Sequence, residues 1–350
     1  MEPCGVFRKD YAEDKAIVRT KLQWGLLIGL LILVFSIPSW LDPGYLGMLR
    51  VTGIFIIAVL GLNMLMGYCG QISLGHAAFM GAGAYACAKV AAAWDLNFIV
   101  SILVGGLGGT LFGMIFALPA ARIKGMYIAL TTLAAQFVFA YVMTRLPASW
   151  FGGSGGIYLP PAHIGDIQIV SQEGLYYLTF AFVVVFTFIA VNISRSKIGR
   201  AFQAIRDNDL AAEVMGINVF AHKLLAFAIS GFFAGVAGAL WAYSTRFVTA
   251  SQFTLWSSIW MAGMVIVGGM GSNLGAILGV ILLRGLEEAI TIGGPALGEA
   301  LPALGGAVRF ALMNTLLGLV IILFLIFEPR GLAHRWQIFK IYYRKWPFPY

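Results

Sequence analysis

The sequence predicts an all-α polytopic membrane protein with about ten transmembrane helices. Of its 350 residues, 60% are hydrophobic and only 11% are charged, whereas soluble domains have roughly 45–50% apolar and 25% charged residues. The mean hydropathy is +0.88, and apolar runs of about 20 residues, the length that crosses a bilayer, recur along the chain. So few charges cannot cover a water-soluble protein of this size, which excludes an ordinary soluble globule.

Ten apolar runs are candidate spans, because a helix satisfies its own backbone hydrogen bonds in lipid. The third run is rich in small residues. The eighth and ninth are separated only by a glycine-rich turn near Gly271, so we expect them to be short, tilted or broken. The predicted spans are 22–41, 48–66, 75–93, 98–119, 125–145, 174–193, 223–244, 255–270, 274–292 and 307–327.

The basic residues predict the orientation, because Lys and Arg are retained on the cytoplasmic side during insertion. Ten spans put both termini on one side, and placing that side inside collects most of the 23 basic residues in cytoplasmic segments. The net charge of +8 therefore indicates topology and not a nucleic-acid partner. The predicted parts are a cytoplasmic segment 1–21, a membrane domain 22–327 with outer loop 146–173 and inner loop 194–222, and a cytoplasmic tail 328–350.

Motifs for catalysis, cofactors and metals are absent from the sequence. Cys4, Cys69 and Cys87 have no metal-type spacing. The glycine-rich segment 152–156 is not followed by Gly-Lys-Ser/Thr, so it does not predict a nucleotide site. No His-Glu-x-x-His or Gly-x-Ser-x-Gly pattern occurs. We therefore expect a non-catalytic chain with no cofactor and no metal.

The segment 67–79 is too polar and glycine-rich for a helix that faces lipid, although apolar runs flank it. Its polar side chains either join helices by hydrogen bonds or face a translocation path, and the sequence leaves both readings open. His76 has no second ligand at metal spacing. The candidates for the path are Gln71, Ser73, His76, Thr131, Thr132 and Gln136.

The inner loop predicts two short helices. Ala201, Phe202 and Ile205 form an apolar strip at helical spacing, and the cap residues 207–209 begin a second amphipathic helix. This helix should end at Gly216, where a positive φ is favoured. A helix lying on lipid would carry more Lys and Arg than this helix, which instead has Asp207, Asp209 and Glu213, so docking onto a cytoplasmic protein is favoured.

Charged and small residues inside two of the spans indicate helix packing. Arg284 lies three and four positions before Glu287 and Glu288, which favours an intrahelical pair over proton coupling. Close helix packing is also expected along the seventh span, at Gly231, Gly235 and Gly238.

From about Leu60 to Leu332, the sequence resembles the permease subunits of branched-chain amino-acid ABC importers of the LivM type. Each shared fragment is modest, and their order along the chain is specific. The fragments are 67–79, 81–85, 122–127, 199–208, 211–217, 267–275 and 329–332. Phe151, Gly155 and Ala276 depart from the family pattern, and related permeases carry urea, short amides or aromatic acids. The resemblance therefore implies an amino acid or a similar small polar solute.

The resemblance also implies an ABC importer permease fold in the bacterial inner membrane, working by alternating access. The implied partners are a second permease of the LivH type, two ATPase subunits, an extracytoplasmic solute-binding protein and membrane lipid, without nucleic acid. The inner helix would be the coupling helix that sits in a cleft of an ATPase. The implied coupling residues are Arg200, Arg206, Asp207, Asp209, Ala211, Ala212, Glu213 and Gly216.

Two other classes of function would need features that differ from these. An ion-coupled secondary carrier acting alone would need Glu287, Glu288 and His76 as titrating groups in its path. A membrane-embedded enzyme would need clustered acids or a nucleophile with a base, and the sequence shows neither.

Overall fold

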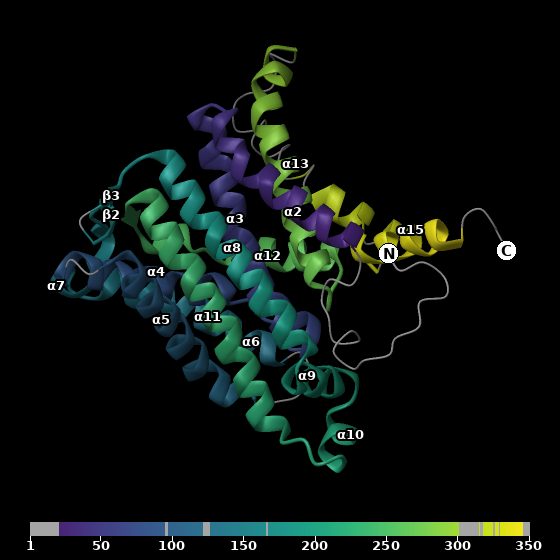
Figure 1. The fold of residues 1–350 in the computed structure, drawn as a ribbon. Helices are drawn as coiled ribbons and strands as arrows, with labels where there is room; N and C mark the ends of the chain where they lie inside the picture. The colour runs from purple at the N-terminus through teal and green to yellow at the C-terminus, as the bar shows by residue number, and fades with distance from the viewer. Residues whose placement is uncertain are drawn as a thin grey trace.

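The computed structural model describes residues 21–94, 97–121, 127–165, 167–300, 315, 318–324, 326–328 and 330–345. Within these residues the chain is mostly helical (Figure 1). Six segments are long and apolar enough to cross a membrane: Pro43–Tyr68, Phe98–Ala120, Tyr127–Arg145, Gln172–Arg195, Val219–Thr245 and Ala250–Gly268. The prediction of a polytopic membrane protein is confirmed, whereas the number of ten spans stays a prediction. Most of the tenth span and segment 1–20 lie outside the described residues.

The helices follow the predicted runs closely, and local chemistry explains several of their ends. Ser171 caps α8, and Asn218 caps α11, each through its side-chain oxygen. The longer helices are α2 (Lys21–Ser36), α3 (Pro43–Asn63), α4 (His76–Trp94), α5 (Phe98–Ala120), α6 (Tyr127–Arg145), α8 (Gln172–Arg195), α9 (Lys197–Asp207), α11 (Val219–Thr245), α12 (Leu255–Gly268), α13 (Asn273–Ala300) and α15 (Leu332–Lys345).

The core is built around α3 and α11. Helix α11 packs on α3, α4 and α5, and α3 also packs on α8 and α13. The predicted small-residue face is confirmed at Gly235, where an added Cβ would overlap the carbonyl oxygen of Gly105 on α5. At Gly238 it would overlap the carbonyl oxygen of Met80 on α4. Glycine is needed at both positions because two helix backbones touch there.

The segment between α3 and α4 interrupts the helical path, as its composition predicts. Helix α3 continues into a π-helical turn, Met64–Tyr68, and residues 69–75 form no regular element before α4 begins. Gly70 has φ 72°, a value that side-chain-bearing residues rarely adopt. This irregular backbone is enclosed by protein, since most of residues 64–76 are buried.

The two ends of the bundle differ (Figure 1). At one end, the predicted outer loop holds α7 (Ala148–Phe151) and the strands β1 (Ile157–Tyr158), β2 (Ala162–Ile164) and β3 (Ile167–Ile169). Strand β1 pairs antiparallel with β4 (Phe247–Val248), and β2 pairs with β3. These short strands were not predicted by the all-α class. At the other end lie α9 and the short helix α10 (Asp209–Val214).

Candidate functional site

The inner loop forms the two helices that its sequence predicts. Ser196 accepts a hydrogen bond from the Gly199 N–H at the start of α9. Phe202 and Ile205 of the predicted apolar strip are buried against the bundle, which fixes α9 to the end of the membrane helices.

Helix α10 is held by its caps and only one of its residues is buried. Asn208 accepts hydrogen bonds from the N–H groups of Leu210 and Ala211, at 3.0 and 3.1 Å. Ala212 packs inward, whereas Leu210 and Val214 are 62% and 87% exposed. Gly216 has φ 83°, so the predicted glycine end of the helix is confirmed. The chain thus presents unpaired apolar side chains on a fixed short helix.

Two interactions tie α9 and α10 to the membrane helices. The Nζ of Lys223, a buried residue on α11, donates to Oδ2 of Asp209 at 2.6 Å. Arg206 Nη1 donates to the carbonyl oxygen of Gly67 in the π-helical turn at 3.0 Å. Arg206 also pairs with Asp207 at 3.1 Å. These contacts join α10 to α11 directly and, through α9, to the π-helical turn at the end of α3.

The remaining predicted coupling residues lie on the exposed side of the same loop. Arg200 Nη1 donates to the Arg195 carbonyl oxygen at 3.2 Å. Ala211 and Glu213 are exposed on α10. Of the predicted coupling set, Ala212 is the buried member, and Asp209 and Arg206 contact the membrane helices.

Three of the six candidates for the path, His76, Thr132 and Gln136, belong to a cluster of hydrogen bonds around the start of α4. Gln136 Oε1 accepts from the Ala78 N–H at 3.0 Å and from Ser258 Oγ at 3.1 Å, and its Nε2 donates to the Phe253 carbonyl oxygen at 2.7 Å. Ser258 Oγ in turn accepts from the Ala77 N–H at 2.9 Å. The first N–H groups of α4 are thus satisfied by side chains of α6 and α12, in place of a local cap.

Thr132 and His76 extend this helix-start cluster, which we define as His76, Thr132, Gln136 and Ser258. Thr132 Oγ1 accepts from the Leu74 N–H at 2.9 Å. His76 Nε2 lies 2.8 Å from the Ala58 carbonyl oxygen on α3. All four residues are buried. Thr131, by contrast, bonds only to the Tyr127 carbonyl oxygen of its own helix, on an exposed face.

Gln71 and Ser73 are buried without complete hydrogen bonding. Gln71 Nε2 donates to the Cys69 carbonyl oxygen at 3.1 Å. Gln71 Oε1 and Ser73 Oγ have no hydrogen-bond partner among the described residues. Of the six candidates, these two are the ones with polar atoms left for another contact.

A second polar junction, which the sequence analysis missed, lies where α3 meets the α12–α13 turn. Asn63 Oδ1 accepts from the Gly271 N–H at 3.0 Å, and Asn63 Nδ2 donates to Asn273 Oδ1 at 3.4 Å. Asn273 Nδ2 donates to Ser194 Oγ at 3.3 Å. The signal in the sequence was a lone Asn at the end of an apolar run. Its partner lies about 200 residues away, so spacing could not pair them.

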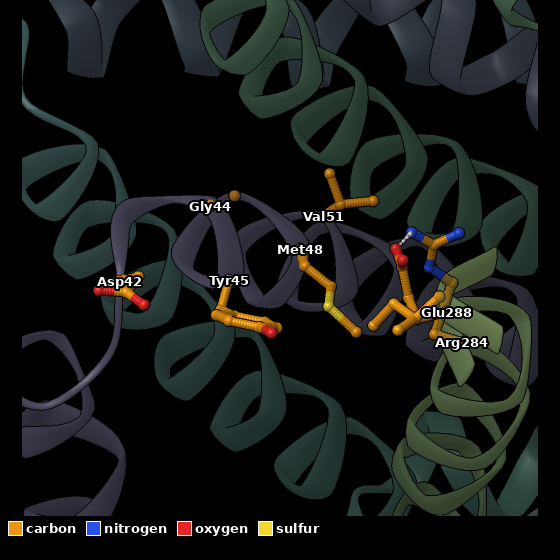
Figure 2. A pocket seen from close by; sticks show the side chains of 9 residues that line it. Asp42, Gly44, Tyr45, Met48, Val51, Arg284 and Glu288 are labelled. Atoms are coloured by element: carbon orange, nitrogen blue, oxygen red, sulfur yellow. Dashed lines mark hydrogen bonds and ion pairs between the residues drawn. The ribbon is translucent and has the colours of Figure 1, made fainter. Parts of the chain in front are cut away.

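The predicted intrahelical pair on α13 is confirmed, and it lines a groove beside α3 (Figure 2). Arg284 Nη1 contacts Glu287 Oε2 at 2.5 Å, and its Nη2 contacts Glu288 Oε1 at 3.4 Å. Arg284 also lies over the ring of Phe55, 5.3 Å from the centroid. Among the described residues, no group of three or more His, Cys, Asp or Glu side chains could hold a metal ion.

Comparison with known proteins decides the family. The model of the family described as "Branched-chain amino acid transport system / permease component" matches residues 44–325. The chain belongs to this permease family. The six apolar spans and the capped inner helices are thus those of a multi-pass membrane permease, and the resemblance inferred from the ordered glycine motifs is confirmed.

Several curated proteins align with most of this permease. The high-affinity branched-chain amino acid transport system permease protein LivM of Escherichia coli K12 is 30% identical, over 78% of this chain and 69% of its own. A probable branched-chain amino acid transport permease protein LivM of Methanocaldococcus jannaschii is 26% identical over 80% of this chain and 90% of its own length. The ribose import permease protein RbsC of Haemophilus influenzae is 24% identical over 81% of this chain and 90% of its own length. No solved structure matches the chain.

Proposed function

We propose that this permease is half of the translocation path of an ATP-driven importer for branched-chain amino acids or a similar small polar solute. The family membership and the names of the two LivM relatives support the amino-acid class. The ribose permease among the relatives indicates that the same fold serves different solutes. In the proposed arrangement, ten spans cross a bacterial inner membrane, and both termini and the loop 194–222 are cytoplasmic.

The observation that carries the proposal is the exposed apolar side of α10. Leu210, Val214 and Met215 are 62%, 87% and 81% exposed on a helix that is capped and anchored. Apolar side chains held in this way are suited to a protein partner. Asp209 and Glu213 beside them disfavour a lipid surface. We assign this partner as one ATPase subunit, which hydrolyses ATP while the permease itself does not.

In this proposal a LivH-type permease supplies the other half of the path. A second ATPase and an extracytoplasmic solute-binding protein complete the importer. Closure of the ATPases moves α10, and the contacts of Asp209 and Arg206 pass the movement to α11 and α3, which alternates access. The polar atoms left on Gln71 and Ser73 make them the members of the predicted path set that we propose for solute contact.

Co-purification from native membranes tests the proposal. The tagged chain should bring a second permease and two ATPase subunits. With the double variant Leu210→Asp/Val214→Asp, the amount of co-purified ATPase should fall at least tenfold, whereas the second permease should still co-purify. The two changes are confined to exposed side chains of α10, so the rest of the chain should be unaffected. The matched control is Tyr158→Asp, because Tyr158 is 76% exposed at the opposite end of the bundle from α10. This variant should still co-purify with the ATPases and the second permease. Purification of the chain alone, with solute uptake driven by a proton or sodium gradient, would favour a secondary carrier.

A further inference from the structure

A groove of about 530 Å³ lies between the first turns of α3 and the second half of α13 (Figure 2). Its size falls within the range of small-molecule sites. It joins acidic, basic and apolar side chains in one place: Asp42, Tyr45, Met48, Val51, Arg284 and Glu288. None of these residues belongs to the helix-start cluster or to α10.

The charged residues lie toward opposite ends of the groove. Asp42, Tyr45, Met48 and Val51 follow one another along α3, and the pair of Arg284 with Glu288 lies at the end away from Asp42 (Figure 2). With a rise of 1.5 Å per residue, Asp42 lies about 9 Å before Met48 along the helix. A small molecule at Arg284 would therefore lie beside Met48 and Val51, with Asp42 and Tyr45 toward the other end of the groove.

The charged groups of the groove are only partly satisfied. Asp42 is the N-cap residue of α3, but its side chain makes no capping bond. The Nε of Arg284 is buried and has no hydrogen-bond partner among the described residues. The contact of Arg284 with Glu288 is long, at 3.4 Å, compared with 2.5 Å to Glu287. A guanidinium carries five N–H groups, so Arg284 retains donors after both contacts.

The charges also match one chemical class. Two acids and one base line the groove, so an ammonium group is attracted, while the free donors of Arg284 fit a carboxylate. In a zwitterionic α-amino acid these two groups are adjacent. Arg284 and Glu288 lie in the predicted span 274–292, where ionisable residues are rare and as a rule face the interior of the bundle or a water-filled cavity.

We propose that this groove, hereafter the α3–α13 groove, binds the transported amino acid. Glu288 accepts from the ammonium group, Arg284 donates to the carboxylate, and Met48 and Val51 contact an aliphatic side chain. Asp42, at the other end of the groove, adds to the attraction of the ammonium group. The inference rests on the proposed function and adds to it the place where the permease itself recognises a zwitterion.

Thiol protection in intact cells tests the inference, because every importer component is present there. The chain carries Met48→Cys, with Cys4, Cys69 and Cys87 replaced by Ser, and the probe is a membrane-impermeant methanethiosulfonate. Leucine should slow labelling at least tenfold. Isocaproate, which lacks the ammonium group, and isoamylamine, which lacks the carboxylate, should not slow it at the same concentration. Tyr45→Cys is a second reporter if Met48→Cys is poorly produced.

Two charge variants identify the ammonium partner. Glu288→Gln should raise the leucine concentration for half protection about tenfold. Glu287→Gln is the matched control: it pairs with the same Arg284 but does not line the groove, and it should leave protection unchanged.

The outcomes separate the inference from the proposed function. If cells take up leucine but leucine does not slow thiol labelling, the groove is not the binding site. That result would not contradict the proposed importer function. Labelling only by a lipid-soluble reagent also overturns the inference, because the groove then faces lipid. Equal protection by isoamylamine contradicts the carboxylate contact. Purification of the chain without ATPase subunits, with solute uptake driven by a proton or sodium gradient, contradicts the proposed function.

Discussion

The helix-start cluster and α10 use polar and apolar side chains in opposite ways. In the cluster, Gln136 and Ser258 are buried and satisfy the first N–H groups of α4 from neighbouring helices. On α10, the backbone is satisfied by its own cap, while Leu210 and Val214 project outward. The cluster is therefore satisfied within the chain, and α10 leaves apolar side chains exposed for the partner that we propose. A buried polar residue in a span can serve helix packing alone, whereas adjacent apolar side chains held exposed on a capped helix are candidates for an interface.

The largest loss of stability should come from replacing Gln136. Gln136→Leu leaves the Phe253 carbonyl oxygen without its donor and the Ser258 hydroxyl without its acceptor. The Ala78 N–H keeps only its contact with the Gly75 carbonyl oxygen. Unsatisfied buried groups cost about 1–3 kcal/mol each, so we expect a loss of several kcal/mol, seen as a large fall in the thermal midpoint of the purified chain.

Thr131→Val is the control for that loss. Thr131 lies on the same helix as Gln136, and its side chain bonds only to the Tyr127 carbonyl oxygen of that helix, on an exposed face. The thermal midpoint of the Thr131→Val variant should therefore hardly change. An equal fall in both variants would contradict the distinction between cluster and surface.

An intermediate loss of stability is expected from breaking the Asp209–Lys223 ion pair, which joins α10 to the bundle. Asp209→Asn leaves the Lys223 ammonium group, whose side chain is only 3% exposed, without its counter-charge. Because Asp209 is itself 26% exposed, water offsets part of the cost, and we expect about 2 kcal/mol or less. ATPase activity of the assembled importer should become less dependent on solute.

Asp207→Asn serves as its comparison, because that carboxylate is 70% exposed and pairs with Arg206 on the surface. Solute-dependent ATPase activity should be retained. If Asp207→Asn and Asp209→Asn behave alike, the buried contact does not transmit movement.

The smallest effect should follow loss of the α10 cap. Asn208→Ala removes the acceptor for two N–H groups, which costs about 1 kcal/mol. Hydrogen exchange of α10 should accelerate roughly fivefold, and ATPase binding should weaken. Asn218→Ala removes the corresponding cap of α11, a 27-residue helix, and α10 should keep its exchange rate.

The fold followed from the sequence where local rules decide it. Apolar length predicted α5, α8 and α11, and cap chemistry at Asn208 and Gly216 predicted α10. The short strands were missed because β1 pairs with β4, about 90 residues later, through two residues on each side. Such pairing leaves no alternating pattern in the sequence.

The candidate site was predictable to the same extent. Gln136, Thr132 and His76 were recognised as buried polar residues, but their partners come from other helices, so spacing could not separate packing from a path. The α3–α13 groove was missed for the same reason. Asp42 and Arg284 are far apart in the sequence, and only packing of α3 against α13 brings them to one groove.

The central claim is that this chain moves solute as one half of an ATP-driven pair, through α10. The most direct test is leucine uptake by liposomes that hold the co-purified complex, with solute-binding protein outside and ATP inside. We predict uptake that requires ATP, persists when proton and sodium gradients are collapsed, and is lost in Leu210→Asp/Val214→Asp. Uptake by the single chain, without ATP and driven by an ion gradient, would contradict the claim.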